Sequence, residues 1–230
     1  MLSGNQLLAA LPVKERERLL PSLKRVPLTL GDVIYEPDER IRYVYFPTSG
    51  VVSLLCTTND GASIEAGTIG MEGMVGISIF LGVDSSPNRA MVQVEGEALR
   101  MKAKVFREMA GLSGRFHDLL HLYTYALMTQ MSLSVACNRF HNVEKRLARW
   151  LLMMQDRAQV DEFRFTQDLI SQMIGTHRPH VSKAANNLHS AGLIRNGRGK
   201  IDILNREGLM KTACDCYLTA KKRFDGLFSV

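Results

Sequence analysis

The chain has 230 residues, of which 46% are hydrophobic and 23% charged, as in an ordinary soluble globular protein. Charged residues interrupt every apolar segment before it reaches the roughly 18 residues of a membrane span. The N-terminus has a short apolar stretch with no basic region before it, which is not typical of a signal peptide. We therefore expect a cytoplasmic protein with no membrane partner.

The net charge of +6 is unevenly distributed along the chain. Residues 1–140 contain 14 Lys and Arg and 14 Asp and Glu, so the whole positive excess lies in residues 141–230. A basic balance confined to one segment favours an anionic partner there, nucleic acid before membrane. A solvated basic face would give the same count.

The four cysteines are Cys56, Cys137, Cys214 and Cys216. Their spacing gives no CxxC pair and no quartet of metal ligands, and the CxC of Cys214 and Cys216 is a weak metal or redox signal. We interpret all four as ordinary reduced cysteines. No metal site and no cofactor is predicted, and a redox role for Cys214 and Cys216 stays open.

The first 24 residues contain apolar and charged positions at helical spacing, which Pro12 and Pro21 divide into short helices. From Pro27 to about Lys104, short β-rich runs alternate with turn-forming groups, a pattern that favours a β-sandwich or small barrel. The predicted strands include residues 33–35, 43–46, 51–55 and 91–94. Between two such runs, the segment 59–61 (Asn-Asp-Gly) predicts a hairpin turn.

Residues 115–137 lack Gly and Pro and carry apolar residues at spacings of three and four, which predicts a helix about 35 Å long. Its apolar surface exceeds what one small sandwich needs, so we expect a dimer contact; packing within the chain is the alternative. Asn142 is the expected cap of a second helix over 143–157, and Asn205 the cap of one last helix from Arg206 onward.

The segment Gln167–Asn186 has the pattern of a helix-turn-helix with Gly175 in the turn. The small residue Ser171 faces the second helix. Thr166 is placed to cap the first helix, and Thr176 or His177 is placed to cap the second. Pro179 suits the first turn of the second helix. Apolar residues fill the inner face at the required spacing: Ile170, Ile174, Val181, Ala184 and Leu188.

The outward face of the second helix carries polar and basic residues suited to DNA. Arg178 and Lys183 are the best candidates for contacting base edges, because an Arg donates two hydrogen bonds to guanine and a recognition helix uses mainly its N-terminal residues. Phosphate contact is the alternative for Lys183, and His180 suits either role. The predicted DNA-binding residues are Thr176, His177, Arg178, His180, Ser182, Lys183, Asn187, Arg198 and Lys200.

Arg198 and Lys200 belong to a predicted hairpin that directly follows the second helix. The runs 193–195 and 200–204 flank an Asn-Gly-Arg-Gly turn over 196–199, which gives a hairpin with a basic tip. A basic hairpin beside a recognition helix suits phosphate contacts next to the groove. Together the two features predict a winged helix-turn-helix.

The order of sandwich, long helix and winged helix-turn-helix resembles the Crp/Fnr family of bacterial transcription regulators over nearly the whole chain. The residues that carry the resemblance are Asn142–Leu152, Ile174–Lys183 and Ser190–Ile194. The resemblance implies an α+β fold with a cyclic-nucleotide-binding-like β-sandwich or jelly roll as sensor domain (1–114), a long dimerisation helix or linker (115–140) and a winged helix-turn-helix DNA-binding domain (141–230).

The resemblance also implies a function. A homodimer formed through helix 115–137 would bind a near-palindromic site in double-stranded DNA, with two recognition helices in major grooves about 34 Å apart. RNA polymerase is a further candidate partner. Arg178 matches the family's base-contacting arginine, whereas Pro179 stands where many members carry an acidic residue, so the half-site preference is expected to differ.

The sensor departs from the cyclic-nucleotide pattern, which pairs a Gly-Glu for the ribose with an Arg for the phosphate. Apolar Ile77 occupies the place of the carboxylate, and either Asn88 or Arg89 stands at the arginine position, depending on the register. The predicted effector pocket comprises Gly76, Ile77, Ser78, Asn88 and Arg89. We therefore expect an effector other than cyclic AMP or cyclic GMP, or none.

Other effectors and functions receive less support from the residues. The N-terminal arm has no cysteines for an iron–sulfur cluster, and a heme would depend on Cys56, His117 or His121 as axial ligand. The alternative function is a module that senses a cyclic nucleotide or other small ligand and acts mainly through a protein partner. No nucleophile–base arrangement, phosphate-binding loop or metal-ligand set indicates an enzyme.

Overall fold

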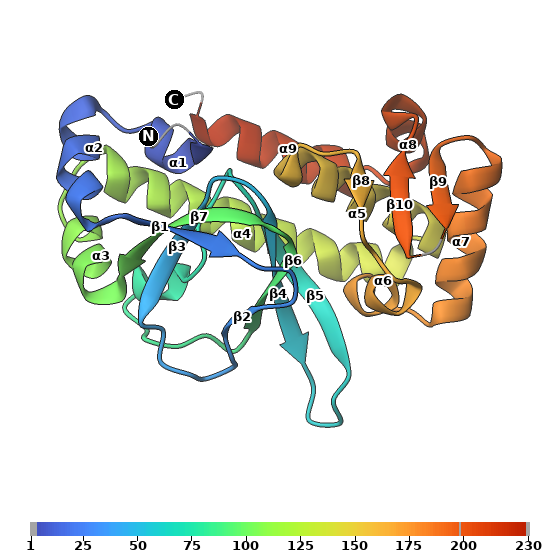
Figure 1. The fold of residues 1–230 in the computed structure, drawn as a ribbon, viewed down its shortest axis with the longest axis horizontal. Helices are drawn as coiled ribbons and strands as arrows, with labels where there is room; N and C mark the ends of the chain where they lie inside the picture. Colours follow the sequence, from blue (N-terminus) through green and yellow to red (C-terminus); the bar gives the residue numbers. More distant parts are fainter. Residues whose placement is uncertain (1–3, 198, 229–230) are drawn as a thin grey trace.

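The computed structural model describes residues 4–197 and 199–228. Three parts follow one another along the chain: a β-sandwich preceded by short helices, one long helix, and a C-terminal group of helices with a small sheet (Figure 1). This is the order that the sequence predicts, and the mixed α+β class is confirmed.

Short helical segments precede the sandwich: α1 (Gln6–Ala9), α2 (Val13–Leu19) and the 3-10 turn η2 (Leu20–Ser22). Asn5 caps α1, and its Nδ2 donates to the carbonyl oxygens of Pro47 and Gly73 at 2.9 and 2.8 Å. This buried amide ties the N-terminal segment to the sandwich. The predicted division at Pro12 is confirmed, since Pro12 is the cap residue of α2. The division predicted at Pro21 is wrong, because Pro21 lies inside η2 and strand β1 follows directly.

Seven strands form the sandwich. One antiparallel sheet has the order β1–β7–β3 and the other the order β2–β6–β4–β5. The strands are β1 (Lys24–Leu28), β2 (Val33–Tyr35), β3 (Tyr43–Pro47), β4 (Val51–Thr57), β5 (Ser63–Ile69), β6 (Arg89–Val94) and β7 (Gly96–Lys102). The predicted hairpin over 59–61 joins β4 to β5, whose last pair is Thr57 with Ser63.

The two sheets face each other across an apolar core, because alternate residues of each strand point inward. The fully buried members from the strands include Val44, Phe46, Val52, Ile69, Val92 and Met101. Two short helical elements border this core, η3 (Ile77–Ile79) and α3 (Ala103–Ala110). The sandwich predicted from the alternating runs is confirmed.

The long helix α4 (Arg115–Phe140) is three residues longer than predicted. Its first half packs on the sandwich core through buried apolar side chains, and the Tyr123 hydroxyl donates to the Met74 carbonyl oxygen at 2.9 Å. Another face of α4 exposes Tyr125, Met128 and Val135, whose residues are 57%, 62% and 73% exposed. The helix therefore has one face in the chain's own core and one apolar face in solvent.

The C-terminal part begins with α5 (Val143–Ala158), which Asn142 caps as predicted by accepting the Lys145 N–H at 2.9 Å. The elements that follow are β8 (Glu162–Phe163), α6 (Gln167–Met173), α7 (Arg178–Ser190), β9 (Ile194–Gly197), β10 (Lys200–Ile203), α8 (Arg206–Thr212), α9 (Cys216–Asp225) and the 3-10 turn η4 (Gly226–Phe228). Strand β8 extends the β9–β10 hairpin to three strands and was not predicted.

The prediction of one last helix from Arg206 onward is wrong, because two helices occupy this segment. Asn205 caps the first as predicted, accepting the Gly208 N–H at 2.8 Å. The break follows Thr212, where Ala213 adopts an extended backbone with ψ near 156°. This turn lets α9 pack along α4 (Figure 1). Neither Gly nor Pro marks the break in the sequence.

A buried ion pair joins the three parts. Arg157, in the last turn of α5, contacts Glu72 of the sandwich, with 3.0 Å between Nε and Oε1 and side chains 7% and 10% exposed. The same guanidinium donates to the Gln130 side chain of α4 and to the Thr68 carbonyl oxygen of β5, both at 3.2 Å. Sandwich, long helix and C-terminal part therefore meet at one cation.

No helix within the described ranges 4–197 and 199–228 is long and apolar enough to cross a membrane.

A second buried polar contact connects the sandwich to α5. Glu65 of β5 accepts a hydrogen bond from the Trp150 indole at 3.1 Å and another from the Ser53 hydroxyl at 2.6 Å. Burial raises the pKa of Glu65 from 4.5 to about 7. Because the folded state binds this proton more tightly than the unfolded state, the folded state loses stability as the pH rises from about 4.5 to about 7.

We expect Glu65→Gln to raise the free energy of unfolding at pH 8, on the order of 1–3 kcal/mol, because the neutral amide removes the cost of a buried charge. The gain should shrink at about pH 5, where the wild-type carboxyl is already protonated in the folded state. Urea unfolding of the two proteins at both pH values measures it. Glu108→Gln, an exposed change on α3, is the matched control. An equal gain at both pH values would contradict the view that the buried charge of Glu65 lowers stability at high pH.

Candidate DNA-binding interface

The helix-turn-helix consists of α6, the turn at Gly175, and α7. The Thr166 hydroxyl caps α6 as predicted, accepting the Leu169 N–H at 3.1 Å. Gly175 has φ +59°, a left-handed conformation that favours glycine, and the Thr176 N–H donates to the Ser171 carbonyl oxygen at 2.9 Å. His177 is the cap residue of α7 but makes no side-chain capping hydrogen bond. The predicted turn is confirmed.

Close packing fixes this turn against the sandwich. A Cβ at Gly175 would lie 2.2 Å from Cδ1 of Ile64 on β5, so the end of the Ile64 side chain would have to move to admit a larger residue. The Gly175 carbonyl oxygen accepts a hydrogen bond from the Arg146 guanidinium of α5 at 3.1 Å. The turn is thus held by the sandwich on one side and by α5 on the other.

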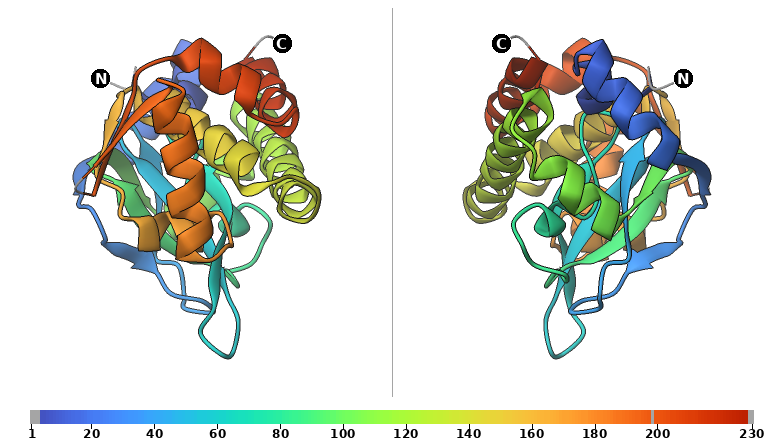
Figure 2. Two further views of the ribbon diagram at one scale, coloured as in Figure 1. Left: turned by 90° about the vertical axis from the view of Figure 1, so that its right-hand side faces the viewer. Right: turned by 90° about the vertical axis from the view of Figure 1, so that its left-hand side faces the viewer.

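The inner face of the motif is apolar, as predicted. The buried set comprises Ile170, Ile174, Val181, Ala184 and Leu188. These side chains join a core with α5 and with the strands β9 and β10. Burial of this face leaves the opposite face of α7 to solvent at the outer end of the molecule (Figure 2, left).

The outward face of α7 carries the predicted basic residues. Arg178, His180 and Lys183 are exposed, and all three lie in the first half of the helix. Arg178 pairs loosely with Asp168 of α6, with 3.6 Å between Nε and Oδ1 and both side chains about two-thirds exposed. An exposed pair of this kind contributes little, so an anionic or base-edge acceptor can displace it.

Other predicted residues of α7 are engaged within the chain. The Ser182 hydroxyl donates to Gln167 of α6 at 2.5 Å, and the Asn187 amide donates to Glu144 of α5 at 2.7 Å. Thr176 is half-buried, and its hydroxyl lies 3.4 Å from Nδ1 of His180. These contacts orient the two helices and one imidazole, and they leave Arg178 and Lys183 as the more available groups.

The wing is the antiparallel pair β9–β10, in which Gly197 pairs with Lys200. Lys200 contacts Glu162 of β8, with 2.5 Å between Nζ and Oε1 in an exposed ion pair. The sequence did not reveal this partner, because β8 is only two residues long. The predicted contact residue Arg198 lies outside the described residues.

The residues predicted for an effector pocket lie at two places in the sandwich. Gly76, with φ +93°, precedes η3, in which Ile77 and Ser78 are half-buried. Asn88 and Arg89 lie at the start of β6, where the Arg89 Nε contacts a Glu36 carboxylate oxygen at 2.7 Å. The cation expected near a phosphate is therefore paired with a carboxylate of the chain itself.

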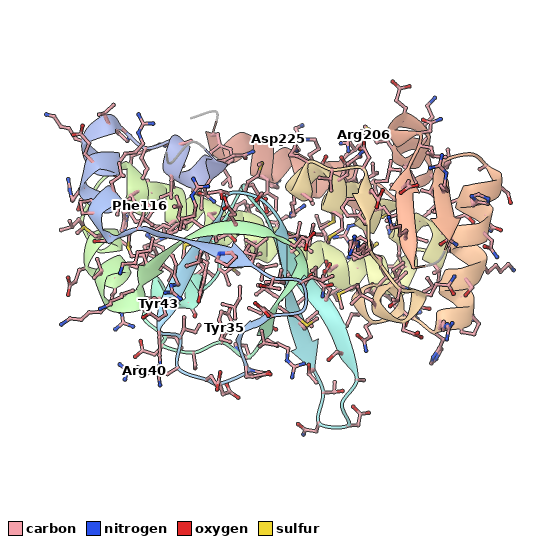
Figure 3. All side chains as sticks on the ribbon, in the orientation of Figure 1. Tyr35, Arg40, Tyr43, Phe116, Arg206 and Asp225 are labelled. Carbon is pink, nitrogen blue, oxygen red and sulfur yellow. The ribbon has the colours of Figure 1, made fainter. Side chains whose placement is uncertain are left out.

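A cavity of about 310 Å³ opens on the sandwich beside the β2–β3 connection, and none of the five predicted pocket residues lines it. Its wall is polar and aromatic, with Tyr35, Arg40 and Tyr43 among its members (Figure 3). The sequence gives no signal for this cavity, because its lining residues come from one short stretch, 34–45, without a ligand-binding pattern.

Comparisons with known proteins agree with this architecture. Residues 25–111 match the family described as the cyclic nucleotide-binding domain, and residues 145–212 match the Crp-like helix-turn-helix domain. None of the curated protein sequences is significantly similar to the chain.

Solved structures share the fold at low sequence identity. FixK2 from Bradyrhizobium japonicum is 20% identical, covers 84% of this chain and 98% of its own, and has a TM-score of 0.70. CLP from Xanthomonas campestris, described as a c-di-GMP responsive global regulator, is 15% identical, covers 84% of this chain and 99% of its own, and has a TM-score of 0.67. A CRP/FNR-family transcriptional regulator from Thermus thermophilus is 19% identical, covers 83% of this chain and 98% of its own, and has a TM-score of 0.66.

The two domain matches cover the sandwich and the helix-turn-helix in the order that the structure shows, with α4 between them. The same arrangement extends over nearly the full length of the solved regulators. The chain belongs to the Crp/Fnr family of transcription regulators.

Proposed function

We propose that the chain is a homodimeric regulator that binds a near-palindromic DNA site through α7 and acts on transcription rather than as an enzyme. The observation that carries the proposal is the exposed basic face of α7, with Arg178 at its first position and Lys183 five residues further. In this proposal residues 1–114 sense, 115–140 pair the two copies and 141–230 bind DNA. RNA polymerase remains a candidate partner.

Charge and position support DNA as the partner. The positive excess of the chain lies in residues 141–230, which include α7. A recognition helix contacts bases mainly with its N-terminal residues, and there Arg178 has an exposed guanidinium with only a loose internal partner. We assign base contact to Arg178, and base or phosphate contact to Lys183 and His180.

The exposed apolar face of α4 supports the homodimer. Tyr125, Met128 and Val135 are separated by three and seven residues, with exposed Ser132 between the last two. This spacing keeps them on one side of the helix, as in a helix pair with a heptad pattern. Two copies related by a two-fold axis would bury these faces against each other and present two α7 helices to one duplex.

We expect Arg178→Ala to lose about 1–3 kcal/mol of discrimination at one base pair of each half-site, because the guanidinium would no longer contact a base edge. The duplex for this test is first recovered by selection from genomic fragments with the wild-type protein. Competition binding against duplexes with single base changes then measures the discrimination at fixed salt.

Arg18→Ala, an exposed arginine on α2 at the opposite end of the molecule, is the matched control and should leave discrimination unchanged. If the selection gives no common sequence and all duplexes bind equally across a range of salt concentrations, the proposed function fails.

The sandwich is unsuited to cyclic AMP in the familiar manner, since Ile77 replaces the ribose-binding carboxylate and Arg89 is paired with Glu36. We expect saturating cyclic AMP to leave the melting temperature of the purified protein unchanged, because a ligand stabilises only the state that it binds. A thermal-shift assay measures this, with a cyclic-AMP-binding family member in parallel. A shift that depends on cyclic AMP concentration would contradict the assignment.

A further inference from the structure

Three cysteines and one histidine gather where the long helix meets the last helix. Cys137 lies in the last turns of α4, His141 follows that helix directly, Cys214 lies in the α8–α9 connection, and Cys216 begins α9. The ligand atoms of all four side chains lie within 4.8 Å of one another. The three cysteines are buried, and the imidazole is 25% exposed.

The separations match those of a mononuclear tetrahedral site. Two sulfur atoms, of Cys137 and Cys214, are 3.5 Å apart, and the Cys216 sulfur is 3.7 Å from Nδ1 of His141. Zinc bonds of about 2.3 Å to sulfur and 2.0–2.1 Å to nitrogen place neighbouring ligands of a tetrahedron roughly 3.4–3.8 Å apart. The remaining pairs of ligand atoms lie no more than 4.8 Å apart.

The surroundings of the imidazole suit a metal ligand. Its Nδ1 faces the Cys216 thiol, while its Nε2 lies 3.8 Å from a carboxylate oxygen of Asp215. A histidine that binds a metal through one ring nitrogen commonly presents the other to a carboxylate, which fixes the ring orientation and tautomer. His141 thus has a metal-facing nitrogen and a supporting group on the opposite side.

A buried cation lies beside the thiols. Arg149 of α5 is 7% exposed and interacts electrostatically with all three cysteines. Its Nη2 donates to the Ser134 hydroxyl at 3.2 Å, while its Nε is buried without a hydrogen-bond partner among the described residues. Three thiolates and one neutral imidazole around a divalent ion carry one negative charge, which this guanidinium would offset.

Ordinary apolar packing explains these features less well. Buried free cysteines usually behave as small apolar residues inside a core. Here the three cysteines form a small cluster of their own, apart from the two large cores, and among the described residues Leu133 is the only partly buried apolar side chain packed against it. Apolar packing does not explain why three thiols lie beside an imidazole, nor why a buried guanidinium lies close to them.

We propose that Cys137, His141, Cys214 and Cys216 bind one zinc ion. Four protein ligands close the coordination sphere, so the site is structural rather than catalytic. It would hold the end of α4 to the start of α9, at the place where the backbone turns between α8 and α9 (Figures 1 and 2). The ion therefore fixes the C-terminal helices relative to the long helix.

Cobalt titration of the full chain tests the site directly. Protein stripped with a chelator under reducing conditions receives cobalt(II) chloride, and absorption is followed. We expect saturation at one cobalt per chain, with the thiolate-to-cobalt charge transfer and intense d–d bands of tetrahedral coordination. Zinc(II) chloride should displace the cobalt at one equivalent, since zinc prefers this geometry and ligand set.

Variants locate the site within the chain. Cys214→Ser should weaken cobalt binding at least about tenfold and lose the intensity of the tetrahedral bands, because one of the four ligands is replaced. Cys56→Ser, an exposed cysteine on β4 outside the cluster, is the matched control and should bind as the wild type does. Circular dichroism verifies that both variants are folded.

Several outcomes would overturn the proposal. If the wild-type protein binds no cobalt under reducing conditions, the proposal fails whatever the variants do. Equal binding by Cys214→Ser and Cys56→Ser places the metal elsewhere. Purified protein with iron and acid-labile sulfide indicates a cluster instead of zinc. A Cys137–Cys214 disulfide together with no metal binding after reduction indicates a thiol pair alone. None of these results bears on DNA binding through α7.

Discussion

The buried ion pair between Arg157 and Glu72 determines how the parts of this protein are placed. Removing two charges from water costs several kcal/mol per ion, and such a pair is tolerated only when further hydrogen bonds satisfy it. Arg157 meets this condition by donating also to Thr68 and Gln130, and Glu72 accepts the Gly70 N–H. The partners belong to the sandwich and to α4, so displacement of α5 would leave a charge buried without its partner.

Contacts around this junction connect the sandwich to the helix-turn-helix. Glu65 of β5 holds the Trp150 indole of α5, and Ile64 of the same strand packs on the turn at Gly175. Strand β5 therefore touches both the helix that supports the DNA-binding motif and the turn within it.

Features set by neighbouring residues could be predicted from the sequence. The α4 helix, the caps Asn142, Thr166 and Asn205, and the turn at Gly175 depend on local spacing and local hydrogen bonds. The inner face of the helix-turn-helix follows from the period of the helix, so its burial was also predictable. The family resemblance rests on these same local patterns.

Features set by distant residues could not be predicted. The pairing of Arg89 with Glu36 and that of Asn187 with Glu144 join residues more than 40 positions apart. The thiol cluster depends on Cys137 and Cys214, which are 77 positions apart. The spacing of cysteines along the chain therefore gave no metal pattern. Likewise, the break between α8 and α9 follows from packing on α4, and no Gly or Pro in the sequence indicates it.

We propose that two copies of this chain bind one duplex through α7. The most direct measurement is a crystal structure of the full-length protein on the duplex recovered by selection. We expect two copies joined along α4, with the first half of each α7 in successive major grooves about 34 Å apart and Arg178 on a base edge. A single copy on the duplex, or DNA held by another surface with α7 facing solvent, would contradict it.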